Sequence, residues 1–550
     1  MSGGRSPKDG RPKRADLLFE IGTEEIPARF LPSLRRQLAV LAERELRNHE
    51  ALDPGAITTF ATPRRLVLLA RGMADRQVDR TVTQPGPFKS QGYDVQGRPT
   101  PAAEGFARKH GVGVADLKEI PDPKGPRLAY VVALKGKAAR EVLPAALERV
   151  LRGLEFPKSM RWPGSPAPFA RPVRWLLALL GSTPLTLAWG RVAAGKTTRG
   201  RRFFHPRPLP VASAAAYAGV LKRAGIVLDV QERRALIQRQ AEALAAKAGG
   251  RVLWNQELLD EVADLVEAPV AVLGSFPADA LEVPQPVLVA SMEEHQRYFP
   301  VAGKDGRLLP KFVTIANGVA TAHVTAGNER VLKARLADAR FFFTEDRKHG
   351  LEVHGRRLDG VVWQANAGSM ADKARRLEAL AHWIAARVGA REGVACRAAE
   401  LAKADLVTHM VGEFPMLQGI TGGLYAAADG EPAGVAEAIR DHYKPAGPGD
   451  DVPATPEGCV VALADKLDQL AGHFALGHAP SGAADPYGLR RAAVGVVRIL
   501  TEQAWHVGLR EVFALAANMF ISGLQVTVEA QGFARAFIRG RVATILEEQG

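Results

Sequence analysis

The hydrophobic pattern near the start of the chain predicts a buried strand followed by an amphipathic helix. The run from Leu17 to Ile21 is typical of a strand, Gly22 and Thr23 end it, and Pro27 suits the first turn of a helix. Leucines at positions 31, 34, 38 and 41 then recur at three- and four-residue spacing. That spacing puts them on one stripe, so we expect the helix to pack against a core and leave an acidic corner before it.

Further along, two kinds of pattern divide the chain near residue 350. Before that point, segments 128–134 and 287–290 are predicted strands, and segments 138–154 and 231–248 are predicted helices. After it the strand signal disappears, and segments 373–388, 489–503 and 533–548 are predicted helices, the last ending near a C-cap at Gly550. We therefore predict a multidomain α+β protein: a disordered basic tail over residues 1–14, a mixed α/β region over 15–350 with two or more subdomains, and an all-α domain over 351–550.

Composition narrows the class of protein. No apolar run approaches the length of about 18 residues that a membrane helix needs, and the basic, polar N-terminus has no apolar segment behind it. The chain has only two cysteines, Cys396 and Cys459, which are too few for a disulfide framework or a Cys-x-x-Cys metal site. We expect a cytoplasmic protein with no membrane contact and no metal site.

Charge suggests the kind of partner. The chain has 73 Lys and Arg against 59 Asp and Glu, a net charge of +14. Such an excess favours a polyanion, because cationic side chains release counterions when they contact phosphates. A surface charge that only keeps the protein soluble would give the same number, so charge alone supports an RNA partner without establishing one.

Residues 190–197 match the phosphate-binding loop pattern Gly-x-x-x-x-Gly-Lys-Thr. A working loop of this kind opens directly into a helix whose N-terminal amides hold the phosphates. The residues that follow, Thr198 to Pro206, contain a glycine and two adjacent aromatics that break any helical stripe. We expect a basic hairpin or loop here, and a nucleotide-binding regulator that uses residues 190–197 remains an alternative.

Eleven short segments carry a family resemblance. They are LFEIGTEEIPA (18–28), TPRRL (62–66), FPKSMRW (156–162), FARPVRW (169–175), EHQRYFP (294–300), ANG (316–318), GNERVL (327–332), ARFFF (339–343), MVGEF (410–414), ADKLD (464–468) and DPYGLRR (485–491). In this order they resemble the β subunit of bacterial heterotetrameric glycyl-tRNA synthetase, from about residue 15 to the end.

The resemblance implies a division of labour between subunits. In that family the smaller α subunit carries the active site and uses ATP and Mg²⁺, whereas the β subunit binds tRNA(Gly) in an α2β2 assembly. The motifs of neither synthetase class occur in this chain. We therefore expect no catalytic residue and no cofactor here, and no charging of tRNA by this chain alone. Relatives continue into a helical anticodon-binding domain, which we expect to be missing here.

The resemblance also implies a fold like that of HD phosphohydrolases in the helical half. Their metal site needs a His, a His-Asp pair and a later Asp. Here Ala428 stands where the His of the pair would be, which leaves Asp429 and Asp465 with no imidazole beside them. Carboxylates alone make a poor transition-metal site, so we expect the fold without its chemistry, with a metal-dependent phosphohydrolase as the alternative.

Basic residues in the family-like segments are the candidate RNA contacts. Lys158, Arg161 and Arg297 lie near aromatics, and Lys333 and Arg340 lie on a basic helix face. Arg490 and Arg491 lie near a predicted helix start, where a phosphate would offset their unfavourable interaction with the helix dipole. A solvated charged face is the alternative for the helix that holds Lys333 and Arg340. The candidates are Arg64, Arg65, Lys158, Arg161, Arg297, Lys333, Arg340, Arg490 and Arg491.

Overall fold

The computed structural model describes residues 13–447, 449–480, 485–520 and 524–549. They form two compact units. The first contains residues 13–247, 254–272 and 315–321, and the second contains residues 248–253, 273–314 and the described residues from Ala322 onward. Most of the predicted basic tail and the predicted cap at Gly550 lie outside the described residues. Arg14, which we also assigned to the tail, is already the first residue of a strand.

A seven-stranded sheet organises the first unit. Its order is β2 (Ala56–Thr62), β3 (Arg65–Ala74), β1 (Arg14–Thr23), β7 (Val173–Leu180), β10 (Val192–Gly195) and β9 (Ala188–Trp189), with β8 (Thr183–Pro184) paired to β7. Strand β1 runs antiparallel to both β3 and β7, and β10 runs parallel to β7. The predicted strand at residues 17–21 is therefore confirmed and lies in the middle of the sheet.

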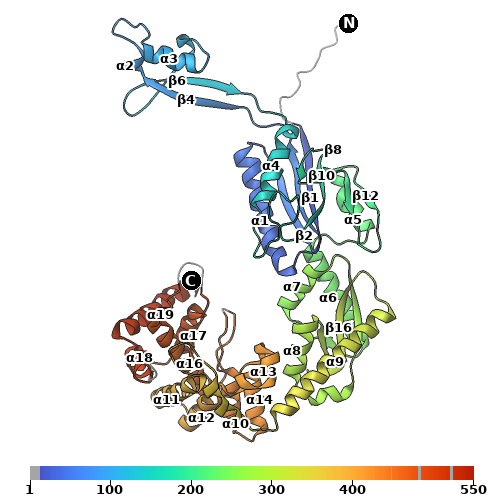
Figure 1. Ribbon diagram of the computed structural model, residues 1–550, viewed down its shortest axis with the longest axis vertical. Coiled ribbons are helices and arrows are strands. Elements are labelled where there is room, and N and C mark those ends of the chain that lie inside the picture. Colours follow the sequence, from blue (N-terminus) through green and yellow to red (C-terminus); the bar gives the residue numbers. More distant parts are fainter. Residues whose placement is uncertain (1–12, 448, 481–484, 521–523, 550) are drawn as a thin grey trace. The chain divides into compact units, whose positions relative to one another are not determined.

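Both faces of this sheet are covered, as Figure 1 shows. Alternate residues of β1 explain why: Leu17, Phe19 and Ile21 belong to one core, with helices α1 (Leu31–Glu43) and α4 (Ala139–Gly153). Leu18 points to the other face and packs with α5 (Tyr217–Arg223). The four leucines of the predicted stripe are buried, and the predicted helix at 138–154 is confirmed as α4.

A smaller sheet and several connecting elements complete the first unit. Strands β4 (Arg80–Phe88), β6 (Arg127–Leu134) and β5 (Lys118–Ile120) form an antiparallel sheet with helices α2 (Lys89–Gly92) and α3 (Pro101–Lys109). Strand β6 confirms the strand predicted at 128–134. Strands β11 (Thr197–Arg199) and β12 (Pro208–Pro210) pair, and α6 (Val230–Lys247), which confirms the predicted helix at 231–248, packs against α7 (Gln256–Leu265).

A four-stranded sheet and two helices follow in the chain. Strands β13 (Arg251–Val252), β15 (Phe299–Ala302), β16 (Leu308–Asn317) and β14 (Pro269–Ser275) are neighbours in that order. Helices α8 (Gln285–Gln296) and α9 (Ala322–Asp346) pack on each other. The strand predicted at 287–290 is wrong, because these residues lie in α8. A short buried apolar run has no periodicity that separates a strand from a helix, and the prolines before it begin a helix.

The remainder of the second unit is helical throughout its described residues, as predicted. It contains α10 (Leu351–Gly355), α11 (Met370–Val388), α12 (Glu392–Leu401), α13 (His409–Glu413), α14 (Ile420–Ala428), α15 (Ala433–Asp441), α16 (Pro456–Ala475), α17 (Leu489–Glu502), α18 (Leu509–Asn518) and α19 (Val528–Gln549). Most of α16 is buried, and helices α11, α12, α15, α17, α18 and α19 contact it. None of the helices among the described residues is long and apolar enough to cross a bilayer.

Candidate nucleic-acid interface

Three of the family-like segments meet at one end of β1. The Thr23 amide donates to the Arg64 carbonyl at 2.8 Å, and the Glu24 amide donates to the Pro172 carbonyl at 3.0 Å. The Ile26 amide donates to the Pro63 carbonyl at 2.7 Å. Backbone hydrogen bonds therefore fix the acidic corner after β1 against the β2–β3 turn and the start of β7.

Gly22 and Trp175 are direct partners across β1 and β7. A Cβ atom on Gly22 would lie 1.9 Å from the indole ring, so only glycine lets the ring lie over the strand. The guanidinium carbons of Arg64 and Arg65 lie 5.6 and 5.7 Å from the ring centroid, within range of a cation–π interaction. The glycine that ended the predicted strand thus makes room for the aromatic residue at the centre of the site.

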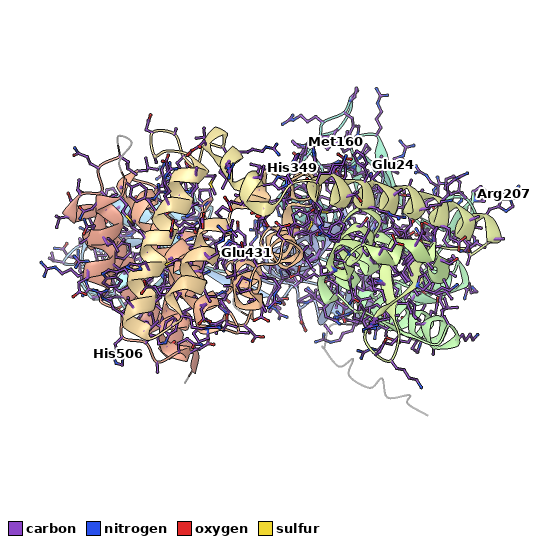
Figure 2. The ribbon with its side chains drawn as sticks, turned by 90° about the horizontal axis from the view of Figure 1, so that it is seen from below. Glu24, Met160, Arg207, His349, Glu431 and His506 are labelled. Carbon is purple, nitrogen blue, oxygen red and sulfur yellow. The ribbon has the colours of Figure 1, made fainter. Side chains whose placement is uncertain are left out.

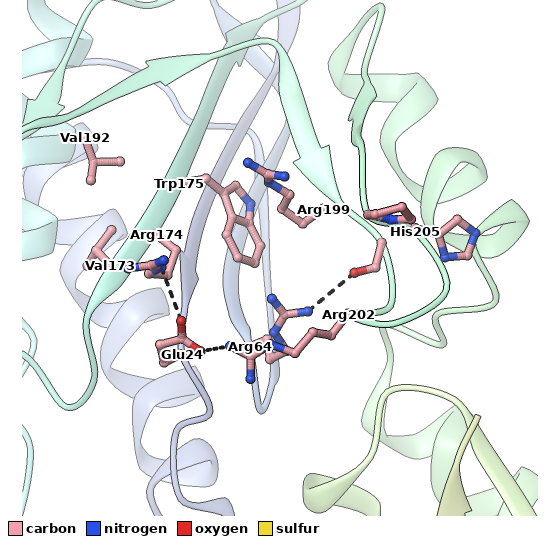
Figure 3. Close-up of a pocket in the computed structure, with 11 residues that line it drawn as sticks. Glu24, Arg64, Val173, Arg174, Trp175, Val192, Arg199, Arg202 and His205 are labelled. Carbon is pink, nitrogen blue, oxygen red and sulfur yellow. Dashed lines mark hydrogen bonds and ion pairs between the residues drawn. The ribbon is translucent and has the colours of Figure 1, made fainter. Parts of the chain in front are cut away.

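A cavity of about 360 Å³ opens at this point, and we call it the arginine pocket. Figure 3 shows its side chains, which come from strand ends and loops that are far apart in the sequence. Its lining contains four arginines and a histidine, and among the described residues that line it Glu24 is the only acid. The lining residues are Glu24, Arg64, Val173, Arg174, Trp175, Val192, Arg199, Gly200, Arg202, His205 and Pro206.

Glu24 holds two of the arginines in place. Its carboxylate oxygens lie 2.5 Å from Arg202 Nη2 and 3.2 Å from Arg174 Nε. Arg64 Nη1 donates a long hydrogen bond of 3.5 Å to the Gly200 carbonyl, and partial burial lowers the pKa of Arg64. Even so, an arginine stays protonated at neutral pH. The pocket therefore has an excess of positive charge and many N–H donors, which suits an anion such as a phosphate.

Arg65 lies beneath the pocket and is fully buried. It donates to Glu267 Oε1 at 2.8 Å, to Glu20 Oε1 at 2.9 Å and to the Arg199 carbonyl at 2.9 Å. We predicted Arg65 as an RNA contact, but in this structure no part of its side chain reaches the surface. Arg65 is therefore a structural residue, because its hydrogen bonds link β3 to β1 and to the end of β11.

The pKa values of the two carboxylates around Arg65 are shifted in opposite directions. Burial raises the pKa of Glu20 above its usual value even though Arg65 is beside it. Burial also acts on Glu267, but Arg65 and hydrogen bonds from Arg65 and Thr62 outweigh it and lower the pKa of that group. The pKa of Arg65 is raised, because these carboxylates outweigh the effect of its burial. Arg65 therefore lies between two buried carboxylates under the pocket, 2.8 Å from Glu267 and 2.9 Å from Glu20.

Lys158 and Arg161 are exposed in the segment between α4 and β7 but do not line the pocket. The segment is held in place because Met160, between them, pairs with Phe169 through hydrogen bonds of 2.9 and 3.1 Å. Both residues therefore remain accessible candidates in the first unit, and nothing in the geometry assigns either a partner.

The candidates of the second unit do not form one cluster. Lys333 and Arg340, which we predicted on one basic face of a helix, both line a cavity of about 230 Å³ on α9. Arg340, however, already pairs with Asp279 at 3.0 Å and Glu282 at 2.8 Å, which reduces the charge available to a phosphate. Arg297 is half-buried at the left-handed C-cap of α8.

Arg490 and Arg491 lie at the start of α17, as predicted. The N-cap residue is Gly488, but the Asp485 carboxylate accepts from the amides of Leu489 at 2.8 Å and Arg490 at 2.9 Å. The aspartate therefore offsets part of the helix dipole that we expected to oppose the arginines. Arg490 is half-buried, and Arg491 is exposed beside a cavity of about 170 Å³.

The residues that sequence reasoning missed are Arg174, Arg199, Arg202 and His205, which make up most of the basic lining of the arginine pocket. Arg174 lies inside a segment that we quoted for the resemblance. The other three belong to the run RGRRFFHP (199–206), whose basic and aromatic mixture was a usable signal for RNA. We used this run only to argue against a phosphate-binding loop.

That argument is supported by the fold of residues 190–197. Strands β9 and β10 pair with Val192 opposite Trp189, so Gly190 and Arg191 form a hairpin turn. Gly190 has φ +61°, and Lys196 is followed by strand β11 rather than by a helix. No helix N-terminus is available to hold phosphates here, and the residues belong to a hairpin, as expected.

In the helical half, the expectation that Asp465 has no imidazole near it is wrong. Lys403 Nζ lies 3.0 Å from Asp465 Oδ2 and 2.9 Å from His442 Nε2, so the aspartate and the histidine share one ammonium group. Lys373 Nζ lies 2.9 Å from the other oxygen of Asp465. Two lysines therefore surround the carboxylate, where a divalent cation would meet repulsion.

These charges are buried and mutually satisfied, and we call them the buried charge cluster: Lys373, Arg376, Lys403, His442, Asp465 and Asp468. Burial alone would raise the pKa of Asp465, but Lys373 and Lys403 lower it below its usual value. Burial and Lys403 lower the pKa of His442 to about 3, so this imidazole is neutral. Asp429 lies elsewhere and accepts the Leu351 amide at 2.6 Å. Among the described residues, no group of three or more metal-ligating side chains comes together.

Comparisons with known proteins agree with the segments quoted above. A family model described as glycyl-tRNA synthetase beta subunit matches residues 17–550. The chain is 42% identical over 538 residues to the glycine–tRNA ligase beta subunit of a Geobacter species, across 97% of this chain and 78% of that one. It is 42% identical over 540 residues to the beta subunit of Pseudomonas fluorescens, across 97% and 78%, and 44% identical over 510 residues to that of Nitratidesulfovibrio vulgaris, across 92% and 73%. The chain therefore belongs to the glycyl-tRNA synthetase beta-subunit family, whose members are subunits of a glycine–tRNA ligase.

Proposed function

We propose that this chain binds tRNA(Gly) while a separate α subunit, in an α2β2 assembly, activates glycine with ATP and Mg²⁺ and attaches it to the tRNA. The observation that carries the proposal is the arginine pocket, where four arginines face one carboxylate at the surface of the first unit. The products of the joint reaction are glycyl-tRNA, AMP and diphosphate. This chain would contribute binding and orientation rather than a reacting group.

The chemistry of the pocket fits a phosphate backbone. Guanidinium groups present planar arrays of N–H donors that match phosphate oxygens, and each phosphate they neutralise releases a condensed counterion. Contacts with Glu24 and the Gly200 carbonyl fix the side chains of Arg174, Arg202 and Arg64 in the pocket. The pocket is thus ordered before its ligand arrives, which lowers the entropic cost of binding.

Aminoacylation separates this role from catalysis. Three reactions with ATP, Mg²⁺, glycine and tRNA(Gly) would contain this chain alone, a glycine-activating α subunit alone, or both. We expect glycyl-tRNA at a useful rate only in the mixture. Charging by this chain alone would contradict the proposal, as would a mixture no faster than the α subunit by itself.

Direct binding tests the physical basis. The logarithm of the association constant of this chain for tRNA(Gly), measured by filter binding or fluorescence anisotropy, should fall linearly with the logarithm of salt concentration. The slope should be close to −0.9 for each phosphate contacted, or about −3 to −4 if most arginines of the pocket take part. Binding that does not respond to salt would contradict a backbone-charge mechanism.

A further inference from the structure

A loop that lines the arginine pocket carries an exposed aromatic residue. Phe203 lies in the loop between the lining residues Arg202 and His205, and 89% of it is exposed. Single exposed aromatics are common on protein surfaces, so exposure alone carries little weight. The position of Phe203 is more informative, because it lies in the same loop as two residues that line a basic cavity.

The loop that carries Phe203 is held in a fixed turn. The amides of Phe204 and His205 donate to the Arg201 carbonyl at 3.1 and 2.9 Å. The Arg201 guanidinium lies 4.3 Å from the centroid of the Phe204 ring, and its Nη1 donates to the Gly318 carbonyl at 3.3 Å. Arg201 and Phe204 therefore anchor the loop, and Phe203 is the more exposed of its two aromatic residues, at 89% against 47% for Phe204.

We propose that the arginine pocket and Phe203 together bind an unpaired nucleotide of RNA, with its phosphate among Arg64, Arg199 and Arg202 and a base stacked on Phe203. This inference rests on the proposed function, since it names the part of the tRNA that the pocket receives. The pocket volume of about 360 Å³ lies within the range of small-ligand sites, roughly 300–1,000 Å³.

The chemistry favours a single strand over a duplex. In a double helix each base face is covered by its neighbours, so an aromatic side chain gains nothing there, whereas an unpaired base offers a free face for stacking. Duplex RNA is contacted mainly through phosphates and 2′-hydroxyls along its grooves, which needs no recessed pocket. A cavity lined by arginines, with an exposed aromatic residue in a loop that contributes to the lining, matches the recognition of unpaired nucleotides.

Glu24 favours a nucleotide over a free phosphate ion. Its carboxylate would repel a phosphate dianion, but it can accept hydrogen bonds from a ribose hydroxyl or an exocyclic amine, which inorganic phosphate lacks. The same carboxylate already orients Arg174 and Arg202. The single acid in a basic pocket therefore has a role when the ligand carries donors as well as a phosphate.

The test uses the full chain and two RNA probes of equal length, a single-stranded hexanucleotide containing 2-aminopurine and a blunt duplex. Phe203→Ala should weaken binding of the single strand about tenfold and leave the duplex within twofold of its original affinity. Phe203→Trp should restore binding and the quenching of 2-aminopurine fluorescence, because it restores a stacking face. Phe203 is exposed, so neither change should disturb folding.

Two further variants separate this inference from the proposed function. Arg202→Gln should weaken both probes and reduce the salt slope by about 1, whereas the control Arg207→Gln should change neither. Arg207, labelled in Figure 2, is exposed in the neighbouring segment but does not line the pocket. If Phe203→Ala leaves single-strand affinity unchanged while the chain still binds tRNA, the inference is overturned and the proposed function stands. If the unaltered chain binds no tRNA, the proposed function itself fails.

Shortened tRNA identifies which part of the molecule supplies the unpaired nucleotide. With tRNA shortened by its unpaired 3′ nucleotides, the difference between the unaltered chain and Phe203→Ala should vanish if the 3′ end occupies the pocket. If a loop nucleotide occupies it, the same difference should persist with the shortened tRNA. Both results support the pocket as a site for an unpaired nucleotide and identify its origin.

Discussion

Two clusters of charge in this protein have opposite uses. The arginine pocket of the first unit places four arginines against Glu24 at the surface. The buried charge cluster of the second unit pairs Lys373, Arg376 and Lys403 with two aspartates away from water. The pocket has unsatisfied positive charge that a ligand can neutralise, whereas the cluster is internally satisfied. Exposure and local charge balance, rather than the number of basic residues, decide which site can bind a polyanion.

The largest expected change is a loss of folding stability when the buried charge cluster is disrupted. Asp468 is fully buried and lies 2.8 Å from Lys373 Nζ and 2.6 Å from Arg376 Nε. Asp468→Asn would remove the carboxylate that pairs with buried Arg376 and would leave Lys373 paired with Asp465 alone. We expect the free energy of unfolding of the second unit to fall by about 3–5 kcal/mol. Urea denaturation followed by circular dichroism measures this loss.

The matched control is Asp359→Asn, since Asp359 is exposed and lies 4.0 Å from Arg375. It should change the free energy of unfolding by less than about 0.5 kcal/mol. Equal effects of the two variants would show that the buried cluster contributes no more than a surface ion pair.

The next largest expected change is in the pH dependence of folding stability, through His442. The pKa of His442 is about 3 in the folded chain and near 6.5 when unfolded, so the unfolded state binds more protons between these values. The folding stability that depends on neutral His442 is complete above pH 6.5 and is lost as the pH falls toward 3. Its maximum slope is about 1.4 kcal/mol per pH unit.

The variant His442→Gln, which does not titrate, isolates this contribution. The difference in unfolding free energy between the unaltered chain and His442→Gln should shift against the unaltered chain as the pH falls below 6.5. A difference that stays constant from pH 7 to pH 4 would mean that His442 is solvated or already charged in the folded state.

A smaller effect is expected in the arginine pocket, and on binding rather than on stability. Arg64 lines the pocket, and among the described residues its side chain makes one long hydrogen bond, to the Gly200 carbonyl, beside its contact with Trp175. Arg64→Gln should weaken tRNA binding by about 1 kcal/mol, roughly fivefold, and reduce the salt slope by about 1. Its unfolding free energy should stay within about 0.5 kcal/mol of the original. If Arg64→Gln lowers the free energy of unfolding but leaves the affinity for tRNA unchanged, Arg64 has a structural role and not a binding role.

The smallest effect should be that of Arg340. This residue is exposed on α9 and already paired with Asp279 and Glu282. Arg340→Gln should alter tRNA affinity less than Arg64→Gln does and alter stability by less than about 1 kcal/mol, because surface ion pairs contribute little. Filter binding of Arg340→Gln, compared with that of Arg64→Gln, would show whether the basic face of α9 also binds RNA.

Local periodicity explains what the sequence could predict. Strand β1, helices α1, α4 and α6 and the helical second half follow from apolar spacing that each segment carries by itself. Residues 287–290 lacked such spacing, and the strand predicted there is a helix. Pro27 marked the start of the helical turns correctly, because its backbone preference acts locally. Gly22 did not end the strand, since β1 continues through Thr23, and its missing side chain instead makes room for Trp175.

Long-range pairing explains what the sequence could not predict. Arg65 was chosen as an RNA contact like its neighbour Arg64, but it is buried by Glu267, which is 202 residues away in the chain. The site near Asp465 depends on Lys403 and His442, which lie on other elements of the helical half. A sequence shows that a residue is basic, but which carboxylate it meets is decided by the fold.

The most direct test of the central claim is tRNA(Gly) affinity at low salt for two double variants of the full chain. One, Arg64→Gln with Arg202→Gln, removes charge from the arginine pocket, and the other, Arg207→Gln with Arg223→Gln, removes the same charge from exposed positions outside it. We expect the first to weaken binding at least tenfold and to reduce the salt slope by about 2, and the second to stay within about threefold. Equal losses in both would contradict the account, because net charge would then explain the binding without a pocket.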